Sequence, residues 1–351
     1  MGHNSKKKQM LQQSDKIALY MQGHLNSDYG KMGFGVLRYA TNDIVAVVDS
    51  EFSGQSVQSV TGIQHTAPIV SSLEEALKYG ANVLILGIAP SGGRIPNDWI
   101  ALIEKALQAG MSIVNGLHDL LEDRFRAHCT FEDQWIWDVR VPQTSPPIAT
   151  AQAAHLTNKR ILFVGTDMAA GKMTAGLELY SWAQKQNINT GFVATGQIGI
   201  TLTGKGIPLD AFKVDLACGA VEEAVLTHKD KDWILIEGQG SLLHPGSTAT
   251  LPLMRGSCPT HMIMCHRAEK THLKFPEHIA IPSLKQFIHL NEQLVSVCGT
   301  YPNAKVAGIA LNTSTLNEEE AQKVIEKIES ETGCPTTDVV RYGCDKLGQA
   351  L

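Results

Sequence analysis

Short apolar runs, bounded by polar residues or glycine, recur along the chain and alternate with stretches whose apolar positions have helical spacing. The strand-like runs are residues 16–21, 43–48, 82–88, 111–114, 160–164, 190–194, 233–236, 261–265, 306–311 and 338–341. Strands that alternate with helices form parallel sheets covered on both faces, and such strands are apolar throughout. The pattern therefore predicts an α/β fold.

Side chains that cap helices mark several helix starts between these strands. Ser71 and Glu74 have the spacing of a capping box for a helix that runs through Leu77. Asn317 precedes a helix over residues 318–328 whose apolar positions lie on one face. Both helices are expected to pack on a sheet.

The chain is long enough for two domains, because 351 residues can fill two separate cores. Residues 141–158, VPQTSPPIATAQAAHLTN, contain three prolines and several small polar residues, a composition typical of a linker. The N-terminal residues are polar and basic and lack the apolar segment of a signal peptide. We therefore expect a mobile tail over residues 1–15, an N-terminal domain over 16–145 and a C-terminal domain over 146–351.

The strongest chemical signal is the segment GTDMAAGKMT, which lies between a strand-like run and a helix-like run. Glycines let backbone N–H groups point inward, a helix start adds partial positive charge, and Lys172 adds a full charge. We expect a cradle for a phosphate-bearing ligand, formed by Gly165, Thr166, Asp167, Met168, Ala169, Ala170, Gly171, Lys172, Met173 and Thr174. The alternative is a glycine-rich turn that only joins a strand to a helix.

This cradle differs from a standard Walker A loop. Five residues rather than four separate Gly165 from Gly171, and Met173 stands between Lys172 and Thr174. In the usual loop the hydroxyl next to the lysine binds the magnesium that accompanies ATP. The displaced threonine therefore argues for a phosphate-bearing ligand more than for ATP hydrolysis.

Two further segments end strands that should lie beside the cradle. The carboxyl ends of neighbouring parallel strands meet at one crevice, so Thr195 and Gln197 are expected near the cradle. Glu237 ends another strand and opens a loop that contains Gln239 and His244. A carboxylate at a strand tip can hold magnesium or accept a proton, whereas a solvent-facing glutamate and a turn histidine are the alternatives.

Arginines flank the strand-like run 261–265. Arg255 precedes it and Arg267 follows it, and either guanidinium can bind a carboxylate through two parallel hydrogen bonds. Ordinary surface charge is the alternative.

The first half of the chain contains weaker signals for a ligand site. The glycines of residues 30–39 do not match the dinucleotide fingerprint, and Asp49 stands where dinucleotide folds place a ribose-binding acid.

Composition excludes several classes of protein. The net charge is −5 and no Lys/Arg cluster is interleaved with aromatic residues, so no nucleic-acid partner is expected. The seven cysteines are scattered and never spaced as CxxC, which argues against a disulfide framework or a zinc site. No apolar run is long enough to span a membrane. We expect a cytoplasmic protein without a membrane partner and, for an α/β enzyme of this size, a symmetric homo-oligomer.

Five segments in this order resemble one known family: GTDMAAGKMT, TGQIGITLTGKGIPLD, IEGQGSLLHPG, LMRGSCPTHMIMCHR and VAGIALNTSTLNEEEA. They are similar to the P-loop family formerly called domain of unknown function 1611. The resemblance spans nearly the whole chain and implies a Rossmann-like N-terminal domain followed by a P-loop NTPase-like parallel-sheet domain. It also implies an N-acetyltransferase that moves acetyl from acetyl-CoA to D-glutamate in D-amino-acid catabolism, beside a racemase acting on N-acetylglutamate.

Transfer to an amine requires a base for the ammonium proton, donors for the developing oxyanion and a cation for the substrate carboxylates. We expect Glu237 or His244 as the base and the N–H groups of Gly238 or Gly240 as oxyanion donors. Arg255 is the expected clamp for an acidic D-amino acid. The cradle, Thr195, Gln197 and Gln239 are expected to hold acetyl-CoA, without a bound metal.

Two other functions stay open at this stage. The cradle also resembles that of dethiobiotin synthetase, which implies an ATP-dependent ligase or kinase. Lys172 would then bind the phosphates of Mg-ATP, and Thr174, Asp167 or Glu237 would bind the magnesium. The third possibility is a nucleotide-binding module without catalysis.

Overall fold

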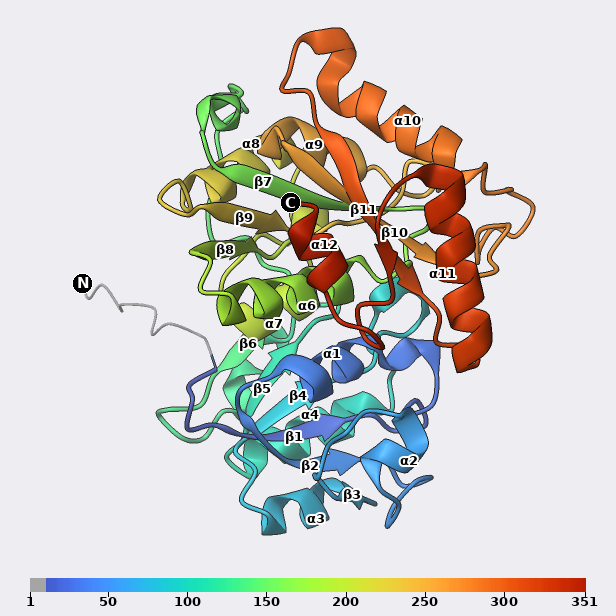
Figure 1. The fold of residues 1–351 in the computed structure, drawn as a ribbon. Helices are drawn as coiled ribbons and strands as arrows, with labels where there is room; N and C mark the ends of the chain where they lie inside the picture. The colour runs from blue at the N-terminus through green and yellow to red at the C-terminus, as the bar shows by residue number, and fades with distance from the viewer. Residues whose placement is uncertain (1–10) are drawn as a thin grey trace. The chain divides into compact units, whose positions relative to one another are not determined.

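The computed structural model describes residues 11–351, which form two compact units (Figure 1). The first unit comprises residues 11–141 and Gln197–Lys205, and the second comprises Pro142–Gly196 and Gly206–Leu351. The chain therefore passes between the units three times. The segment Gln197–Lys205 belongs to the first unit, although the sequence pattern assigned it to the C-terminal domain.

The expected mobile tail falls mainly on residues 1–10, which lie outside the described residues. The part of it that the structure describes is attached to the first unit. The Gln13 side-chain amide donates to the carbonyl of Thr41 at 2.8 Å, and the Asn42 amide donates to the carbonyl of Gln12 at 2.5 Å. Residues 12 and 13 thus form hydrogen bonds with residues 42 and 41.

The first unit contains a six-stranded, wholly parallel sheet with strand order β3-β2-β1-β4-β5-β6. Its strands are β1 Lys16–Tyr20, β2 Asp43–Val48, β3 Ile69–Val70, β4 Val83–Leu86, β5 Ser112–Asn115 and β6 Ile136–Asp138. Its helices are α1 Lys31–Tyr39, α2 Val57–Thr61, α3 Leu73–Lys78, α4 Trp99–Gln108, α5 Glu122–Phe125 and α7 Gln197–Thr203, with 3₁₀ turns at Asp28–Gly30, Ser91–Gly93 and Arg126–His128.

The second unit contains another six-stranded parallel sheet, with strand order β12-β11-β10-β7-β9-β8 (Figure 1). Its strands are β7 Lys159–Gly165, β8 Thr190–Val193, β9 Trp233–Ile236, β10 His261–Arg267, β11 Lys305–Asn312 and β12 Thr336–Thr337. Its helices are α6 Lys172–Lys185, α8 Val214–Leu226, α9 Thr250–Ser257, α10 Leu284–Ser296, α11 Glu318–Thr332 and α12 Asp345–Gln349, with 3₁₀ turns at Gln152–His155, Leu209–Ala211 and Val297–Gly299. The predicted α/β class with parallel sheets is confirmed in both units.

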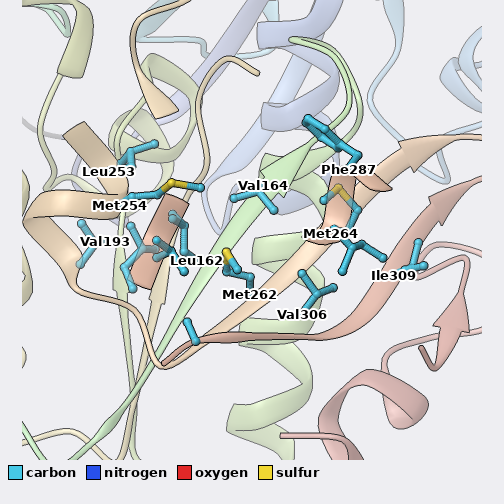
Figure 2. Packing of buried hydrophobic residues seen from close by; sticks show 14 of the residues in the cluster. Leu162, Val164, Val193, Leu253, Met254, Met262, Met264, Phe287, Val306 and Ile309 are labelled. Atoms are coloured by element: carbon cyan, nitrogen blue, oxygen red, sulfur yellow. The ribbon is translucent and has the colours of Figure 1, made fainter. Parts of the chain in front are cut away.

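Both faces of the second sheet are covered, which explains why its strands are apolar throughout. Alternate residues of β7 and β10 point into one core together with residues of α9 and α10, as Figure 2 shows for Leu162, Val164, Met262, Met264, Leu253, Met254 and Phe287. Phe163, between Leu162 and Val164 on β7, faces the opposite side of the sheet. Its ring lies 3.5 Å from the position that a Cβ on Gly176 of α6 would take. Helix α6 therefore packs closely on the opposite face.

The segment expected to be a linker, residues 141–158, packs on the second unit. The Glu222 carboxylate on α8 accepts hydrogen bonds from the backbone N–H groups of Thr150, at 2.8 Å, and Gln152. Gly219, one turn earlier, has no room for a side chain, because a Cβ there would lie 1.7 Å from the carbonyl oxygen of Pro147. Most of this segment is therefore fixed along α8.

Several element ends differ from the prediction, and two of the differences change the role of a residue. Residues 338–341 are not a strand: β12 ends at Thr337, and the Asp338 carboxylate turns back to accept the N–H of Thr313 at 2.8 Å. The cap of α3 is Ser72 rather than Ser71. The cap of α11 is confirmed, since Asn317 and Glu320 form a complete capping box. Among the described residues, no helix combines the length and apolarity needed to cross a membrane.

Candidate active site in the second unit

The turn after β7 has the backbone of an anion cradle. Residues 166–171 connect β7 to α6, and Gly171 has a φ of +98°, a conformation that residues with a Cβ rarely adopt. Helix α6 begins at the next residue, so the N–H groups of its first turn have no partner within the helix. A helix start reached through such a turn favours negatively charged ligands.

Lys172 places its charge inside this turn. The side chain is buried, and its ammonium donates to the carbonyl oxygens of Asp167 at 2.7 Å and Met168 at 3.1 Å. Nζ also lies 3.1 Å from the position that a Cβ on Gly165 would take. The positive charge is therefore held within the cradle, as an anion site requires, rather than extended into solvent.

Glu237 lies directly after β9, the strand that pairs with β7. Its side chain is only 2% exposed. Oε2 accepts the backbone N–H groups of Thr195 at 2.9 Å and Gly196 at 3.2 Å, and Oε1 accepts the amide of Gln239 at 3.3 Å. Burial raises the pKa of Glu237 to about 7, although the two N–H groups and the charge of Lys172 lower it. Both protonation states are therefore populated near neutral pH, which suits proton transfer.

Close backbone contacts hold these groups together. A Cβ on Gly238 would lie 1.6 Å from the carbonyl oxygen of Phe163 and 2.9 Å from Cδ of Lys172. A Cβ on Gly196 would lie 2.3 Å from Nε2 of Gln239 and 3.2 Å from Oε1 of Glu237. Both glycines are required because backbone or side-chain atoms fill the space where their Cβ atoms would be. The cradle, Thr195, Glu237 and Gln239 are thus brought together as expected.

Two contacts of the cradle involve residues that the expected set lacks. The Thr166 hydroxyl lies 2.8 Å from Nδ1 of His266, near the end of β10, and the Asp167 carboxylate accepts the backbone N–H of Lys274 at 2.8 Å. Burial lowers the pKa of His266 to about 4, so its imidazole is neutral at pH 7. His266 follows the apolar run 261–265, and a polar residue at such a strand end is a sequence signal that could have identified it as part of the site. The Lys274 contact is made by the backbone and leaves no such signal.

His244, in the loop after Glu237, is unsuited to act as the base because its acceptor nitrogen already has a partner. The imidazole Nδ1 accepts the backbone N–H of Gly246 at 3.1 Å, so in the neutral ring the proton lies on Nε2. In this tautomer Nε2 is a donor. Of the two residues expected as base, Glu237 therefore has the suitable geometry, while His244 can donate a hydrogen bond.

The sequence matches two family models that together cover most of the chain. Residues 147–348 match the DUF1611 P-loop domain and residues 50–142 match the DUF1611 Rossmann-like domain, both described as domains of unknown function. The chain belongs to the DUF1611 family. The family resemblance expected from the motifs is confirmed.

Individual relatives extend the comparison. The chain is 37% identical over 283 residues to a protein of Tritonibacter scottomollicae named D-glutamate N-acetyltransferase, covering 80% of this chain and 84% of that one. It is 36% identical over 279 residues to a Pseudoalteromonas protein of the same name, covering 79% and 83%. A crystal structure of a DUF1611 family protein from Anabaena variabilis superposes with a TM-score of 0.93 at 46% identity, over 96% of this chain and 99% of that one.

In this DUF1611 chain Arg255 is not brought to the cradle. It lies in the last turn of α9, shortly before β10 begins, whereas the cradle lies where the strands end. Its guanidinium donates to the carbonyls of Leu294 at 2.8 Å and Val295 at 3.4 Å, and stacks over the ring of Tyr301. These contacts cap the C-terminal end of α10, which is a structural role.

Arg267 has the position that Arg255 lacks. It is the last residue of β10, half-buried, at the end of the sheet where the cradle lies. Side chains alternate between the two faces of a strand, so Arg267 is on the same face of β10 as Cys265. Cys265 in turn lies close enough to Lys172 to be influenced by its charge. Within the part of the chain that the structure describes, the guanidinium of Arg267 forms no hydrogen bond or ion pair. It is the arginine suited to bind a carboxylate in this DUF1611 site.

The remaining expected residues have the following places. Met173 and Thr174 are half-buried in the first turn of α6, and Gln197 begins α7 in the first unit, where its Cγ lies 3.2 Å from the position of a Cβ on Gly116. Across the described residues, no group of three or more His, Cys, Asp or Glu side chains is arranged to hold a metal ion. In the first unit Asp49 is fully buried and accepts the N–H groups of Leu25 and Glu51. It therefore supports a turn instead of facing a ligand.

Proposed function

We propose that this DUF1611 chain is an N-acetyltransferase that moves acetyl from acetyl-CoA to the amino group of a D-amino acid, with D-glutamate as the principal acceptor. The observation that carries the proposal is the 36–37% identity, over about four-fifths of the chain, with two proteins named D-glutamate N-acetyltransferase. The geometry supports it because an anion cradle and a buried carboxyl group with a pKa of about 7 lie side by side.

The residues of the site fit an acyl transfer from acetyl-CoA to an amine. When bound, acetyl-CoA supplies the acetyl group as an activated thioester. Glu237 takes the proton from the acceptor ammonium, which makes the amine nucleophilic. The amine nitrogen then bonds to the thioester carbonyl carbon, the carbon–sulfur bond breaks, and coenzyme A leaves as a thiolate that takes up a proton. The backbone N–H groups of Gly238 and Gly240 are the available donors for negative charge that develops on the carbonyl oxygen. Arg267 binds the distal carboxylate of the acidic acceptor.

Two kinds of anion suit the cradle: the phosphates of acetyl-CoA and a carboxylate. Both accept hydrogen bonds from backbone N–H groups at a helix start, and both pair with the ammonium of Lys172.

A second function, an ATP-dependent ligase or kinase, is favoured by Lys172 together with Thr174 in the first turn of α6. The nature of the products distinguishes the two functions.

The test uses the full chain with acetyl-CoA and D-glutamate, and in parallel with ATP and D-glutamate. We expect free thiol to appear in step with N-acetylated D-glutamate, at a rate well above that with L-glutamate. A ligase or kinase would instead form ADP in proportion to substrate, with no thiol released from acetyl-CoA. Binding of ligands without either product would leave only a nucleotide-binding module.

The two arginines near β10 provide a matched pair of variants. Arg255→Met removes hydrogen bonds from a charged group to the end of α10 and should lower the free energy of unfolding by about 1–3 kcal/mol. Acetyl transfer should be unchanged. Arg267→Met should leave stability within about 0.5 kcal/mol, since its guanidinium has no partner among the described residues, and should raise KM for D-glutamate at least about tenfold.

Urea denaturation and steady-state kinetics on both variants give the two readouts. The reverse pattern, in which Arg255→Met raises KM for D-glutamate and Arg267→Met does not, would return the carboxylate clamp to Arg255.

A further inference from the structure

The cradle and Glu237 are immediate neighbours. They follow β7 and β9, which are adjacent strands in register from Lys159 with Trp233 to Leu162 with Ile236. Adjacent strands are about 5 Å apart, so the groups at their ends are separated by little more than one residue's width. The Lys172 stem passes the backbone of Gly238, the residue after Glu237. The two charges therefore lie close enough to act on one small ligand bound at these strand ends.

The charges of this pair are opposite. On one side are the ammonium of Lys172 and the N-terminal end of α6, and on the other is the carboxyl group of Glu237. A phosphate in the cradle gains from the first group but meets ionised Glu237 as a like charge. Met173 stands where the usual loop has the hydroxyl that binds a cation, and Thr174 lies one helical step further round, so the usual means of offsetting this repulsion is displaced. The pair is complementary to a ligand with a negative and a positive group close together.

An α-amino acid has this charge arrangement, because one carbon atom carries both its carboxylate and its ammonium. We propose that the cradle binds the α-carboxylate of the acceptor amino acid and that Glu237 binds its amino group. This inference rests on the proposed acetyltransferase function and makes the P-loop an amino-acid site. The phosphates of acetyl-CoA then bind outside the cradle.

The arrangement also fits the chemistry assigned to Glu237. With the α-carboxylate in the cradle, the amine lies beside the carboxylate that takes its proton, and the distal carboxylate is free to reach Arg267. With the phosphates of acetyl-CoA in the cradle, the thioester is separated from Glu237 by the pantetheine arm unless that arm folds back. Direct proton transfer requires the acceptor nitrogen within hydrogen-bond reach of the base.

The experiment compares D-glutamate with 4-aminobutanoate, which keeps the amine and the distal carboxylate but lacks the α-carboxylate. For the wild type we expect kcat/KM with acetyl-CoA to be at least about a hundredfold higher for D-glutamate. In Lys172→Met this preference should fall below about tenfold, while KM for acetyl-CoA changes less than about threefold. Lys185→Met, at the exposed far end of α6, is the control and should retain the wild-type preference.

Two results would overturn the inference without affecting the proposed function. One is a wild type that uses both acceptors almost equally. The other is a Lys172→Met variant that keeps the preference and raises KM for acetyl-CoA tenfold or more, which would place the phosphates of acetyl-CoA in the cradle. Absence of acetyl transfer by the wild type would remove the function and the inference together.

Calorimetric titration covers a variant that folds but does not turn over. D-glutamate should bind Lys172→Met at least tenfold more weakly than the wild type, whereas the Kd for coenzyme A should be unaltered. A Lys172→Met variant that binds coenzyme A at least tenfold more weakly and D-glutamate as tightly as the wild type would count against the inference. Lys172→Gln, which removes the charge but keeps a polar side chain, repeats both measurements if the methionine variant does not fold.

Discussion

Replacing Glu237 with glutamine is expected to lower the turnover of acetyl transfer about a hundredfold, the usual size of a general-base contribution. The substitution keeps the shape of the side chain. A glutamine oxygen can still accept the N–H groups of Thr195 and Gly196, and Gln239 can turn its amide to meet the new NH₂ group. The fold should therefore be retained while the proton acceptor is lost. Single-turnover and steady-state rates of thiol release measure the effect.

The pH dependence of the rate provides a second readout for Glu237. In the wild type the base is active only when ionised, so kcat/KM should rise with pH through a pKa of about 7. The Glu237→Gln variant should lose this limb of the profile. A variant that retains both the wild-type rate and the same limb would exclude Glu237 as the base.

Stability should change with pH in the opposite sense. Burial raises the pKa of Glu237 in the folded state from 4.5 to about 7, so between these values the folded state keeps a proton that the unfolded chain releases. The resulting contribution is fully present below pH 4.5 and is lost as the pH rises through 7. Its size is about 3 kcal/mol. Urea denaturation should therefore show the wild type losing this amount relative to Glu237→Gln between about pH 4 and pH 8.

Glu222 offers a matched control, because it is another buried glutamate that accepts backbone N–H groups, those of Thr150 and Gln152. It lies on α8 and holds Thr150 and Gln152, outside the set of residues that contact the cradle. Glu222→Gln is expected to lower stability by about 1–3 kcal/mol and to leave the pH profile of turnover unchanged. Equal kinetic effects of the two substitutions would mean that Glu237 acts only through the fold.

Much of the fold could be predicted because strands buried on both faces are apolar throughout, and that signal is local. Three of the four strands at the sheet edges, β3, β6 and β12, are the exceptions. β3 and β12 have two residues each and β6 has three, so they are too short to produce a run. Residues 338–341 have a strand-like pattern in the sequence. However, the carboxylate of Asp338 accepts the N–H of Thr313, which is distant in sequence, and the strand ends before it. Such a partner is invisible to a local pattern.

The candidate site shows the same division between local and distant information. Lys172 and Glu237 were found because the ends of adjacent strands are fixed by the parallel topology. The place of Arg255 depends on the length and direction of α9, whose last turn comes just before β10 begins, at the end of the sheet opposite the cradle. Its partners are main-chain carbonyls of α10, which any residue type supplies. The sequence therefore led to Arg255 as the expected clamp, although the structure places this side chain at the end of α10.

Gly238→Ala is expected to remove both activity and most of the stability of the second unit. A Cβ at this position would lie 1.6 Å from the carbonyl oxygen of Phe163, 2.7 Å from its carbonyl carbon and 2.9 Å from Cδ of Lys172. Backbone atoms cannot move aside as a flexible side chain can, so the end of β9 must separate from β7. We expect a loss of more than about 4 kcal/mol in the free energy of unfolding, measured by urea denaturation.

The control for this substitution is Gly246→Ala in the same loop. There a Cβ would meet only the imidazole of His244, at 3.3 Å, and this side chain can shift by a few tenths of an ångström. Its cost should stay below about 1 kcal/mol, with acetyl transfer retained. If Gly238→Ala were as well tolerated as this control, the close contact between β7 and the Glu237 loop would not be present in solution. Lys172 and Glu237 would then lose the proximity on which the amino-acid site depends.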